Sequence, residues 1–368
     1  MSSTTGTQQE KQYPCGQCGA KLSFLPGTDE LKCPYCGFEN KIAVGTAKIE
    51  ELDYLSYLQQ AAQEKDTHEA QRVKCEKCGA ETTMPENATS GLCPFCGTNV
   101  VFAGKSSHLI RPEGLLPFRV NQKDAFKDFR DWIASLWFAP GDLKNYAQSE
   151  GKLVGVYIPF WTYDSDTISN YTGQRGTYYY TTETYTAEEN GRTVTRTRQV
   201  RHTMWTPVSG TVANNFDDVL ILASNSLPRT YADRLQPWDL KNLLPYSDEY
   251  LSGFRAESYQ VSLPQGFEEA KEVMAQVIRN SVGQDIGGDE QQIDSINTQY
   301  SAITFKHILL PVWLSAYRFH DKVYRILINA RTGHVQGERP YSSFKIAVAI
   351  IAVVILIAVI LFVMNQNH

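Results

Sequence analysis

Residues Ile346–Met364, IAVAIIAVVILIAVILFVM, divide the chain into a membrane segment and a soluble body. They are nineteen apolar residues without a charge, a glycine or a proline. A helix of this length spans about 28 Å, close to the ~30 Å hydrocarbon core of a bilayer. A helix buried in a soluble core normally keeps a polar face, and this segment has none. The sequence therefore predicts a transmembrane helix over residues 344–364.

The residues on either side of this segment predict its orientation. The N-terminal sequence MSSTTGTQQEKQ has no apolar region of the kind found in signal peptides. Arg331, Arg339 and Lys345 precede the apolar segment, and no Lys or Arg follows it. The positive-inside rule then places the body in the cytoplasm. We expect a tail-anchored, single-pass protein.

All eight cysteines lie before residue 97 and form two identical patterns. Each reads C-x2-C-x14-C-x2-C, and the second repeats the first after sixty residues, which indicates an internal duplication. In a reducing compartment this spacing indicates zinc rather than disulfides. The predicted ligands are Cys15, Cys18, Cys33 and Cys36 in the first set and Cys75, Cys78, Cys93 and Cys96 in the second.

The spacing suits a closed, structural zinc site, as in zinc ribbons. Two residues between thiolates let one tight turn place both sulfurs ~2.3 Å from the same ion, and two such turns complete a tetrahedron. A glycine follows the second cysteine of each pair, where the turn can require a positive φ. We expect two structural Zn²⁺ ions, each supplying on the order of 10 kcal/mol of folding free energy.

The charge of the ribbon region bears on what it contacts. Residues 1–104 contain nine Lys and Arg against thirteen Asp and Glu, and eight thiolates with two Zn²⁺ would add a further net negative charge. A surface that binds phosphates needs a concentrated basic patch, and this region is acidic. Nucleic-acid binding is therefore disfavoured, and a protein partner is expected.

The parts of the chain follow from these segments. We expect zinc ribbons at residues 1–46 and 74–104, and an α+β domain at 105–341. Residues 47–73 carry apolar side chains at helical spacing and predict a helical linker, with a short coiled coil as the alternative. Two further helices are expected, one from Asn121 to Pro140-Gly141 and one over Gly266–Ile286. The first has an apolar stripe expected in the core: Phe126, Phe129, Ile133, Leu136 and Trp137.

The dipeptide Asn190-Gly191 predicts a type I′ hairpin. With this loop, partner residues sum to 381, so Glu183 faces Arg198 and Glu189 faces Arg192. The flanking segments are rich in Tyr and Thr and poor in aliphatic residues, which predicts an arm projecting from the core over about residues 176–206. Its arginines and tyrosines could read as a strip that binds nucleic acid, but the cross-strand glutamates favour a solvated arm that binds protein.

Other strands are expected around this arm. Val154–Tyr163 predicts one strand, Val208–Ser224 two, and the sequence from Phe305 to Pro340 predicts three strands separated by turns. The phrases IPFWTY, from Ile158, and LPVWLSAY, from Leu310, suggest two similar half-sheets, with each proline at a strand start or edge. The fold class is therefore α+β: two small zinc ribbons, an antiparallel β-rich domain with packed helices, and one transmembrane helix.

No catalytic constellation is apparent in the sequence. The sequence Gly104-Lys105-Ser106 lacks the upstream glycine of a phosphate-binding loop, because position 99 is Asn. His202, His307, His320 and His334 are scattered over strands and turns. We expect no enzyme, and therefore no catalytic residues and no cofactor other than zinc.

The order of these parts resembles a family of bacterial membrane proteins with tandem zinc ribbons and a C-terminal anchor. The resemblance rests on the paired cysteine sets, the hairpin NGRTVTRTRQVRH, the segment FKHILLPVWLSAYRF and the terminal apolar segment. Such proteins are often labelled primosomal protein N′, or replication factor Y helicase, but this chain has no Walker A motif. The resemblance implies the bacterial cytoplasmic membrane and partners of the SPFH (flotillin-like) or phage-shock-A-like envelope-stress type.

Three functions therefore compete. The first is a membrane-tethered adaptor whose ribbons and arm recruit a cytosolic or membrane-associated protein. The second is a nucleic-acid-binding module held at the membrane, which would bind DNA in a salt-dependent way. The third is an enzyme with an unrecognised site in the α+β domain, which would show a pocket with convergent polar groups.

Overall fold

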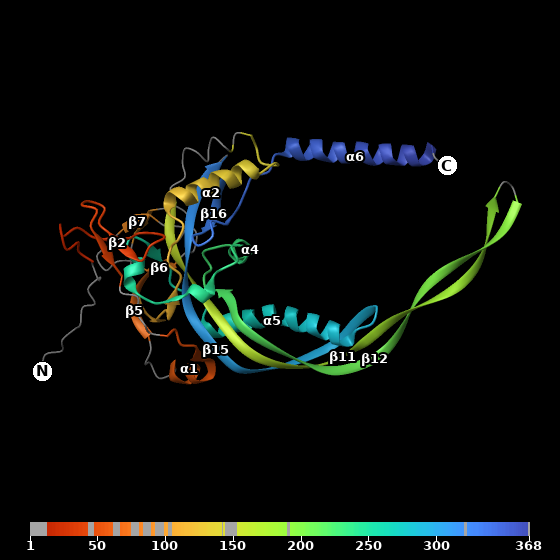
Figure 1. Ribbon diagram of the computed structural model, residues 1–368, viewed down its shortest axis with the longest axis horizontal. Helices are drawn as coiled ribbons and strands as arrows, with labels where there is room; N and C mark the ends of the chain where they lie inside the picture. Colours follow the sequence, from red (N-terminus) through yellow and green to blue (C-terminus); the bar gives the residue numbers. More distant parts are fainter. Residues whose placement is uncertain are drawn as a thin grey trace.

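The computed structural model describes residues 13–42, 48–61, 67–74, 81–83, 90–92, 99–101, 105–141, 143, 153–189, 192–319 and 322–366 (Figure 1). Within them it confirms the predicted fold class. A cluster of cysteines lies near the N-terminus, a mixed body of helices and antiparallel sheet follows, and a single apolar helix ends the chain.

Three long strands form the frame of the body. They are β11 (Val154–Glu189), β12 (Arg192–Leu222) and β15 (Glu290–Phe319), and β11 lies between the other two. Short strands extend this sheet beyond β15 and at its margins: β4 (Leu52–Asp53), β10 (Gly114–Leu115), β13 (Leu244–Pro245), β14 (Arg255–Ala256), β16 (Lys322–Asn329) and β17 (Val335–Gly337).

The predicted hairpin register is confirmed. Partners in β11 and β12 sum to 381 from Ser165 opposite Phe216 to Glu189 opposite Arg192. The sequence did not predict how long these strands are. β12 is one strand where Val208–Ser224 predicted two, and β15 begins at Glu290, earlier than expected. These extra residues are mostly polar, and they join the sheet because long neighbouring strands offer them hydrogen bonds.

The two proline phrases are neighbours in this one sheet and not separate half-sheets. Tyr157 lies opposite Pro311, and Pro159 lies opposite Leu309, so both prolines occupy inner strands. Each proline carbonyl accepts a hydrogen bond from a residue just beyond the end of a neighbouring strand, Ala223 after β12 and Ala330 after β16. A proline has no backbone N–H to donate to a neighbouring strand. Opposite each of these prolines the neighbouring strand has already ended, so no strand hydrogen bond is lost, and inner strands tolerate these prolines.

The long strands bend along one line. Register shifts in β11 against both neighbours meet around Asp164, and the extra residues lie in β12 and β15. Asp218 and Ala302 adopt φ values of 53° and 49° there, a conformation that residues other than glycine rarely adopt. Such bulges bend and twist strands, and the sheet curves away from the body into a long arm (Figure 1).

Helix α2 (Gln122–Ser135) starts as expected, because Asn121 Oδ1 accepts a hydrogen bond from the Asp124 backbone N–H at 2.9 Å. Phe129 and Ile133 are buried beneath it. The prediction that Trp137 belongs to the core is wrong. The helix ends at Ser135, so the helical periodicity stops and Trp137 is 79% exposed.

Helix α5 (Leu263–Ile286) runs along the bent sheet and contacts all three long strands. Phe267, Ala270, Met274 and Ile278 are buried as predicted, whereas Val277 is exposed. The helix stops at Gly287 and Gly288, which have φ values of 63° and 79°. The remaining short helices are α1 (Tyr54–Ala61), α4 (Arg229–Asp233), η1 (Leu240–Asn242) and η2 (Asp248–Leu251).

The N-terminal strands form three small sheets. The first ribbon has β1 (Ser23–Phe24), β2 (Glu30–Lys32) and β3 (Glu39–Lys41); the others are β5 (Thr67–Lys74), β6 (Glu81–Thr83) and β9 (Lys105–Ile110), and β7 (Ser90–Leu92) with β8 (Asn99–Val101). The predicted helical linker holds only at α1. Thr67–Lys74 is a strand because it pairs with β6 and β9, which outweighs its helix-forming composition.

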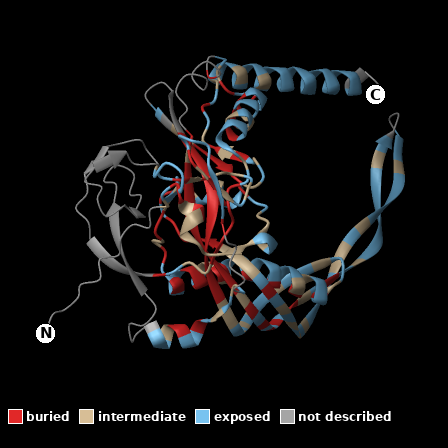
Figure 2. Cartoon of the chain, turned by 60° about the vertical axis from the view of Figure 1, so that its left-hand side comes forward, coloured by how far each residue is buried: buried red, intermediate tan, exposed pale blue. Residues whose placement is uncertain are grey.

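The terminal helix α6 (Ser343–Gln366) includes the predicted transmembrane segment. Residues Ser343–Met364 are long and apolar enough to cross a membrane, and none of the segment is buried inside the protein. It extends away from the body with exposed side chains along its length (Figure 2). A candidate membrane-spanning helix is therefore present where the sequence placed it.

Candidate metal centre and projecting arm

The first four-cysteine set comes together as predicted. One turn before β1 and one turn after β2 bring Cys15 and Cys36 to 3.5 Å between sulfurs, and Cys18 and Cys33 also to 3.5 Å. All four sulfur atoms lie within 4.8 Å of one another, and none forms a disulfide. A tetrahedral ion with ~2.3 Å bonds to sulfur holds its ligands about 3.8 Å apart. This sulfur cage therefore fits a zinc ion.

The backbone of each turn is shaped for this cage. Gly19 and Gly37 have φ values of 75° and 74°, and a side chain at either position would meet nothing within 4 Å. Their conformation, and not crowding, is why these residues are glycine. Backbone N–H groups of the turns, among them that of Cys36, lower the pKa of Cys33, whereas the neighbouring thiols raise the pKa of Cys18 and Cys36.

The first ribbon is joined to the body by a shared core. Cys15 and Cys33 are buried in the same apolar cluster as Phe118 and Phe129 of the body. The Phe24 ring packs edge-on against Tyr250 at 5.2 Å, and the Phe24 N–H donates to the Ser252 carbonyl at 2.9 Å. The metal-binding turns therefore support part of the body's core, which the sequence pattern did not predict.

The second four-cysteine set, Cys75, Cys78, Cys93 and Cys96, lies outside the described residues. The short strands β5 to β9 around it are described. The count of two metal sites stays a prediction.

The predicted arm is the other prominent feature. β15 leaves the sheet where Glu290 pairs with Gly176, and β11 and β12 continue as a two-stranded ribbon from Thr177 to Glu189 and from Arg192 to Met204. We call this ribbon the arm. Its thirteen residue pairs correspond to roughly 40 Å of extended strand. Figures 1 and 2 show it reaching far beyond the body with mostly exposed side chains.

The base of the arm is fixed by the end of α5. The Asp289 N–H donates to the Gly176 carbonyl at 2.8 Å, and the Tyr178 N–H donates to Asp289 Oδ2 at 2.7 Å. Arg175 Nε donates to the Ile286 carbonyl at the helix C-terminus. The sequence predicted packing at the base but not these residues, whose only signal was an acidic pair following two glycines.

The surface of the arm combines aromatic and charged side chains. Arg198 and Glu183 form an ion pair at 3.0 Å, as the register predicted. The Arg201 guanidinium lies 4.3 Å from the centre of the Tyr178 ring, and His202 stacks on Tyr179 at 5.2 Å. Its exposed large side chains are Tyr179, Tyr180, Tyr185 and Met204.

A group of carboxylates at the bend of the sheet could also hold a cation. Glu51, Asp164 and Asp217 have carboxylate oxygens within 4.8 Å of one another. However, Lys306 Nζ lies 2.9 Å from Glu51 Oε1 and 2.8 Å from Asp218 Oδ1. Because the buried lysine already supplies a positive charge to this cluster, it is a structural ion-pair network.

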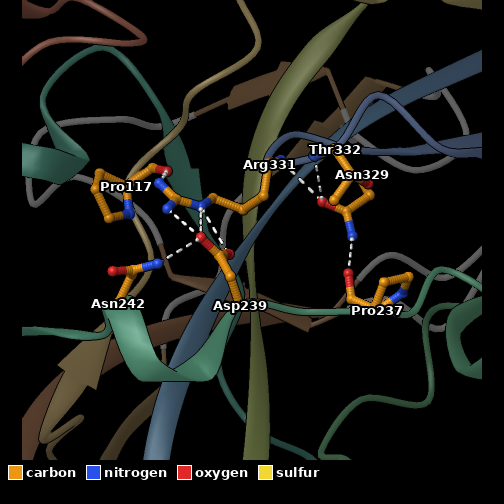
Figure 3. A network of polar contacts seen from close by, with 7 residues as sticks. All are labelled: Pro117, Pro237, Asp239, Asn242, Asn329, Arg331 and Thr332. Carbon is orange, nitrogen blue, oxygen red and sulfur yellow. Dashed lines mark hydrogen bonds and ion pairs between the residues drawn. The ribbon is translucent and has the colours of Figure 1, made fainter.

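Arg331 is the centre of the polar network in Figure 3, and it too has a structural role. It pairs with Asp239 through two guanidinium nitrogens, and its Nη1 donates to the Pro117 carbonyl at 3.0 Å. Buried Asn329 donates to the Leu235 carbonyl at 2.9 Å and accepts from the Arg331 N–H at 2.8 Å. Since Asp239 neutralises Arg331, the positive charge next to α6 comes from Arg339 and Lys345.

Comparison with known proteins gives one informative similarity. The chain is 25% identical over 340 residues to a protein of Bacillus subtilis (strain 168) described as uncharacterized protein YdjG, which covers 91% of this chain and 92% of the relative. No protein-family model and no solved structure matches the chain. The similarity extends over most of both chains and carries no statement of function.

Proposed function

We propose that this chain is a membrane-tethered zinc-ribbon adaptor, which recruits a cytosolic or membrane-associated protein to the membrane. In this proposal α6 is a tail anchor, the body faces the cytoplasm, and the two cysteine sets bind two structural zinc ions. The class of partner in this proposal comes from the resemblance stated above, which implies SPFH or phage-shock-A-like proteins of the bacterial cytoplasmic membrane.

The arm is the observation that carries the proposal. An isolated two-stranded ribbon is marginally stable, and ordering thirteen residue pairs costs conformational entropy. The arm buries little of its own surface, so its stability is not explained by a core. A length of this kind is best accounted for by a partner that contacts it.

The chemistry of the arm favours a protein. Exposed tyrosines and arginines are the side chains enriched at protein interfaces. The outer edge of β12 and, beyond Gly176, the outer edge of β11 have no neighbouring strand among the described residues, so an extended segment of a partner could add to either edge. Four arginines stand against three glutamates between residues 177 and 204, so the arm has almost no net positive charge to bind nucleic acid.

Shortening the arm tests the proposal. Residues Thr182–Val200 are replaced by a short Gly-Ser turn, and the full chain is purified from membranes with its bound proteins. We expect unchanged zinc content and membrane attachment but loss of the partner. Recruitment by the shortened chain would leave the function to the ribbons and reject the arm as the binding surface.

Control variants separate the arm from the body. Exchange of the exposed α5 residues Val273 and Val277 for serine changes a solvent-facing apolar patch outside the arm. This variant is expected to retain the partner. If it also loses the partner, the body rather than the arm makes the contact.

A further inference from the structure

The turn that follows α2 exposes two aromatic residues in succession. Leu136 and Ala139 are buried at its ends, whereas Trp137 between them is 79% exposed and Phe138 is 41% exposed. We call Trp137 and Phe138 the aromatic turn. A large apolar side chain left in water forgoes the favourable free energy of burial. An aromatic pair held rigidly in solvent therefore suggests a surface that covers it.

The aromatic turn lies against the start of α6. The Ser342 N–H donates to the Phe138 carbonyl at 2.8 Å. Lys345 Nζ donates to the Trp137 carbonyl at 3.1 Å and to the Ala139 carbonyl at 2.8 Å. These three hydrogen bonds join a turn of the body to the residues that enter the candidate membrane span.

Further aromatic side chains surround the same point. Tyr341 is 58% exposed and Phe344 is 77% exposed, immediately before and at the start of α6. Phe138 and Tyr341 also flank an apolar groove that continues along Ile346, Ile350 and Val353 on the first turns of the helix. The exposed aromatic surface is thus continuous with the surface that a bilayer would cover.

The chemistry of this surface matches the headgroup region of a membrane. Trp and Tyr concentrate at membrane–water interfaces, where an apolar ring and a polar edge can both be satisfied. Lys345 and Arg339, which lies over the Tyr341 ring at 5.3 Å, supply the cations that anionic headgroups attract. A soluble protein partner would need to fit between this surface and the membrane that α6 enters.

We propose that Trp137 and Phe138 insert into the lipid headgroup layer, so that the body contacts the membrane at a second point beside α6. This inference rests on the proposed membrane attachment of α6. Two contacts with the membrane, one through α6 and one through the aromatic turn, restrict rotation of the body about α6. The orientation of the arm relative to the membrane surface is thereby limited.

Fluorescence quenching tests the insertion directly. The full chain is reconstituted into phosphatidylcholine vesicles that contain lipid with a doxyl group near the headgroup or deep in the acyl chain. Of the other five tryptophans, Trp161 and Trp313 are buried, Trp132 and Trp238 are partly buried, and Trp205 lies at the base of the arm. We expect strong quenching by the shallow doxyl group in the wild type, and loss of most of this quenching in Trp137→Phe.

Trp205→Phe is the matched control, because it removes an exposed tryptophan far from α6 along the sheet. It is expected to leave quenching by the shallow lipid unchanged. Equal quenching of the wild type and Trp137→Phe would overturn the inference, as would loss of quenching in Trp205→Phe instead. Vesicle flotation separates the two proposals: a chain that does not float refutes the membrane anchor, whereas a chain that floats without Trp137 quenching refutes only the insertion.

Discussion

Single residues in the first ribbon connect metal binding to the core of the body. Because Cys15 and Cys33 are buried with Phe118 and Phe129, loss of the metal ion should not remain a local event. From the sequence, each zinc site was expected to fold only its own ribbon. The shared core changes that expectation, because unpacking of Phe24 from Tyr250 would open an apolar surface on the body.

Cys33→Ser tests this coupling. We expect the zinc content to fall from two ions to one per chain, and the body to lose more than about 4 kcal/mol of unfolding free energy through loss of the metal. Elemental analysis and thermal unfolding of the full chain in detergent measure the two effects. Tyr35→Ser is the control, since Tyr35 is 83% exposed between two ligands and should leave both quantities unchanged. Unaltered body stability in Cys33→Ser would show that the ribbon folds independently.

Lys306 is the buried cation that pairs with carboxylates at the bend of the sheet. Burial alone would lower its pKa, but hydrogen bonds to Asp218 and Glu51 outweigh burial and raise it. The bond from Lys306 lowers the pKa of Glu51. The raised lysine pKa stabilises the fold at all pH values below its unfolded pKa of about 10.4. The lowered carboxyl pKa stabilises it above about pH 4.3, so both contributions are present at pH 7.

Lys306→Met leaves these carboxylates facing one another without a cation. We expect a loss of about 2–3 kcal/mol at pH 7, near the lower end for a broken buried pair because Glu51 is partly exposed. In the variant the carboxyl pKa values rise above their unfolded values, so the deficit should shrink as the pH falls toward 4. Urea unfolding at both pH values measures this. Lys32→Met, which breaks an exposed pair with Glu39, should cost less than about 1 kcal/mol at either pH.

Sequence patterns predicted the residues whose role depends on neighbours along the chain. The cluster of the four described cysteines and the hairpin register follow from spacing and turn chemistry alone. Trp137 and Lys306 could not be placed in this way. Trp137 continues a helical stripe beyond the point where the helix ends, and Lys306 and its partners Glu51 and Asp218 come from three separate segments.

At the scale of elements, the arm depends on its base. β15 supports β11 as far as Gly176, and Asp289, just after α5, forms hydrogen bonds with Gly176 and Tyr178 of β11. A side chain at Gly176 would place Cβ 2.8 Å from Thr203 Cγ2 and 3.0 Å from the Trp205 ring. This glycine is therefore required by the close approach of the two strands.

Gly176→Ala should loosen the arm without unfolding the body. We expect a cost of about 1–3 kcal/mol from overpacking, concentrated at the base, and faster hydrogen exchange of the backbone amides beyond Thr177. Gly283→Ala in α5 is the opposite control, because nothing lies within 4 Å of the added Cβ and alanine favours a helix by up to ~1 kcal/mol. Slower or unchanged exchange in the arm of Gly176→Ala would contradict this role of the base.

Sequence patterns did not predict that the long strands are continuous. The residues from Glu290 to Ala302 are mostly polar and were not predicted as a strand. They form one because β11 already presents an edge for pairing and α5 covers the bent sheet. The same effect made Thr67–Lys74 a strand where composition favoured a helix. Pairing between distant segments overrode local preference in both cases.

At the scale of the whole molecule, the arm and α6 extend to the same side of the body (Figure 1). The arm is rich in Thr, Glu and Arg and has unpaired edges, so it cannot lie in the hydrocarbon region beside α6. In a bilayer we therefore expect the arm to stay in water, on the body's side of the membrane.

Limited trypsin digestion of proteoliposomes measures the position of the arm. In molecules whose body faces outward, trypsin should cut after the arm residues Arg192, Arg196 and Arg198, because the arm lies in water. The protease should leave α6 intact. Protection of these arginines while loops of the body are cut would place the arm in or across the membrane and would reject the expected position of the arm in water.

Site-specific photocrosslinking in cells tests the adaptor proposal most directly. The photoreactive residue p-benzoylphenylalanine is introduced at Thr182, an exposed position on the same face of the arm as Tyr180, and separately at Val277 on α5 as a control. The adaptor proposal predicts a discrete protein adduct of one partner from position 182 and none from position 277. The absence of any protein adduct from position 182, or the same adducts from both positions, would contradict it.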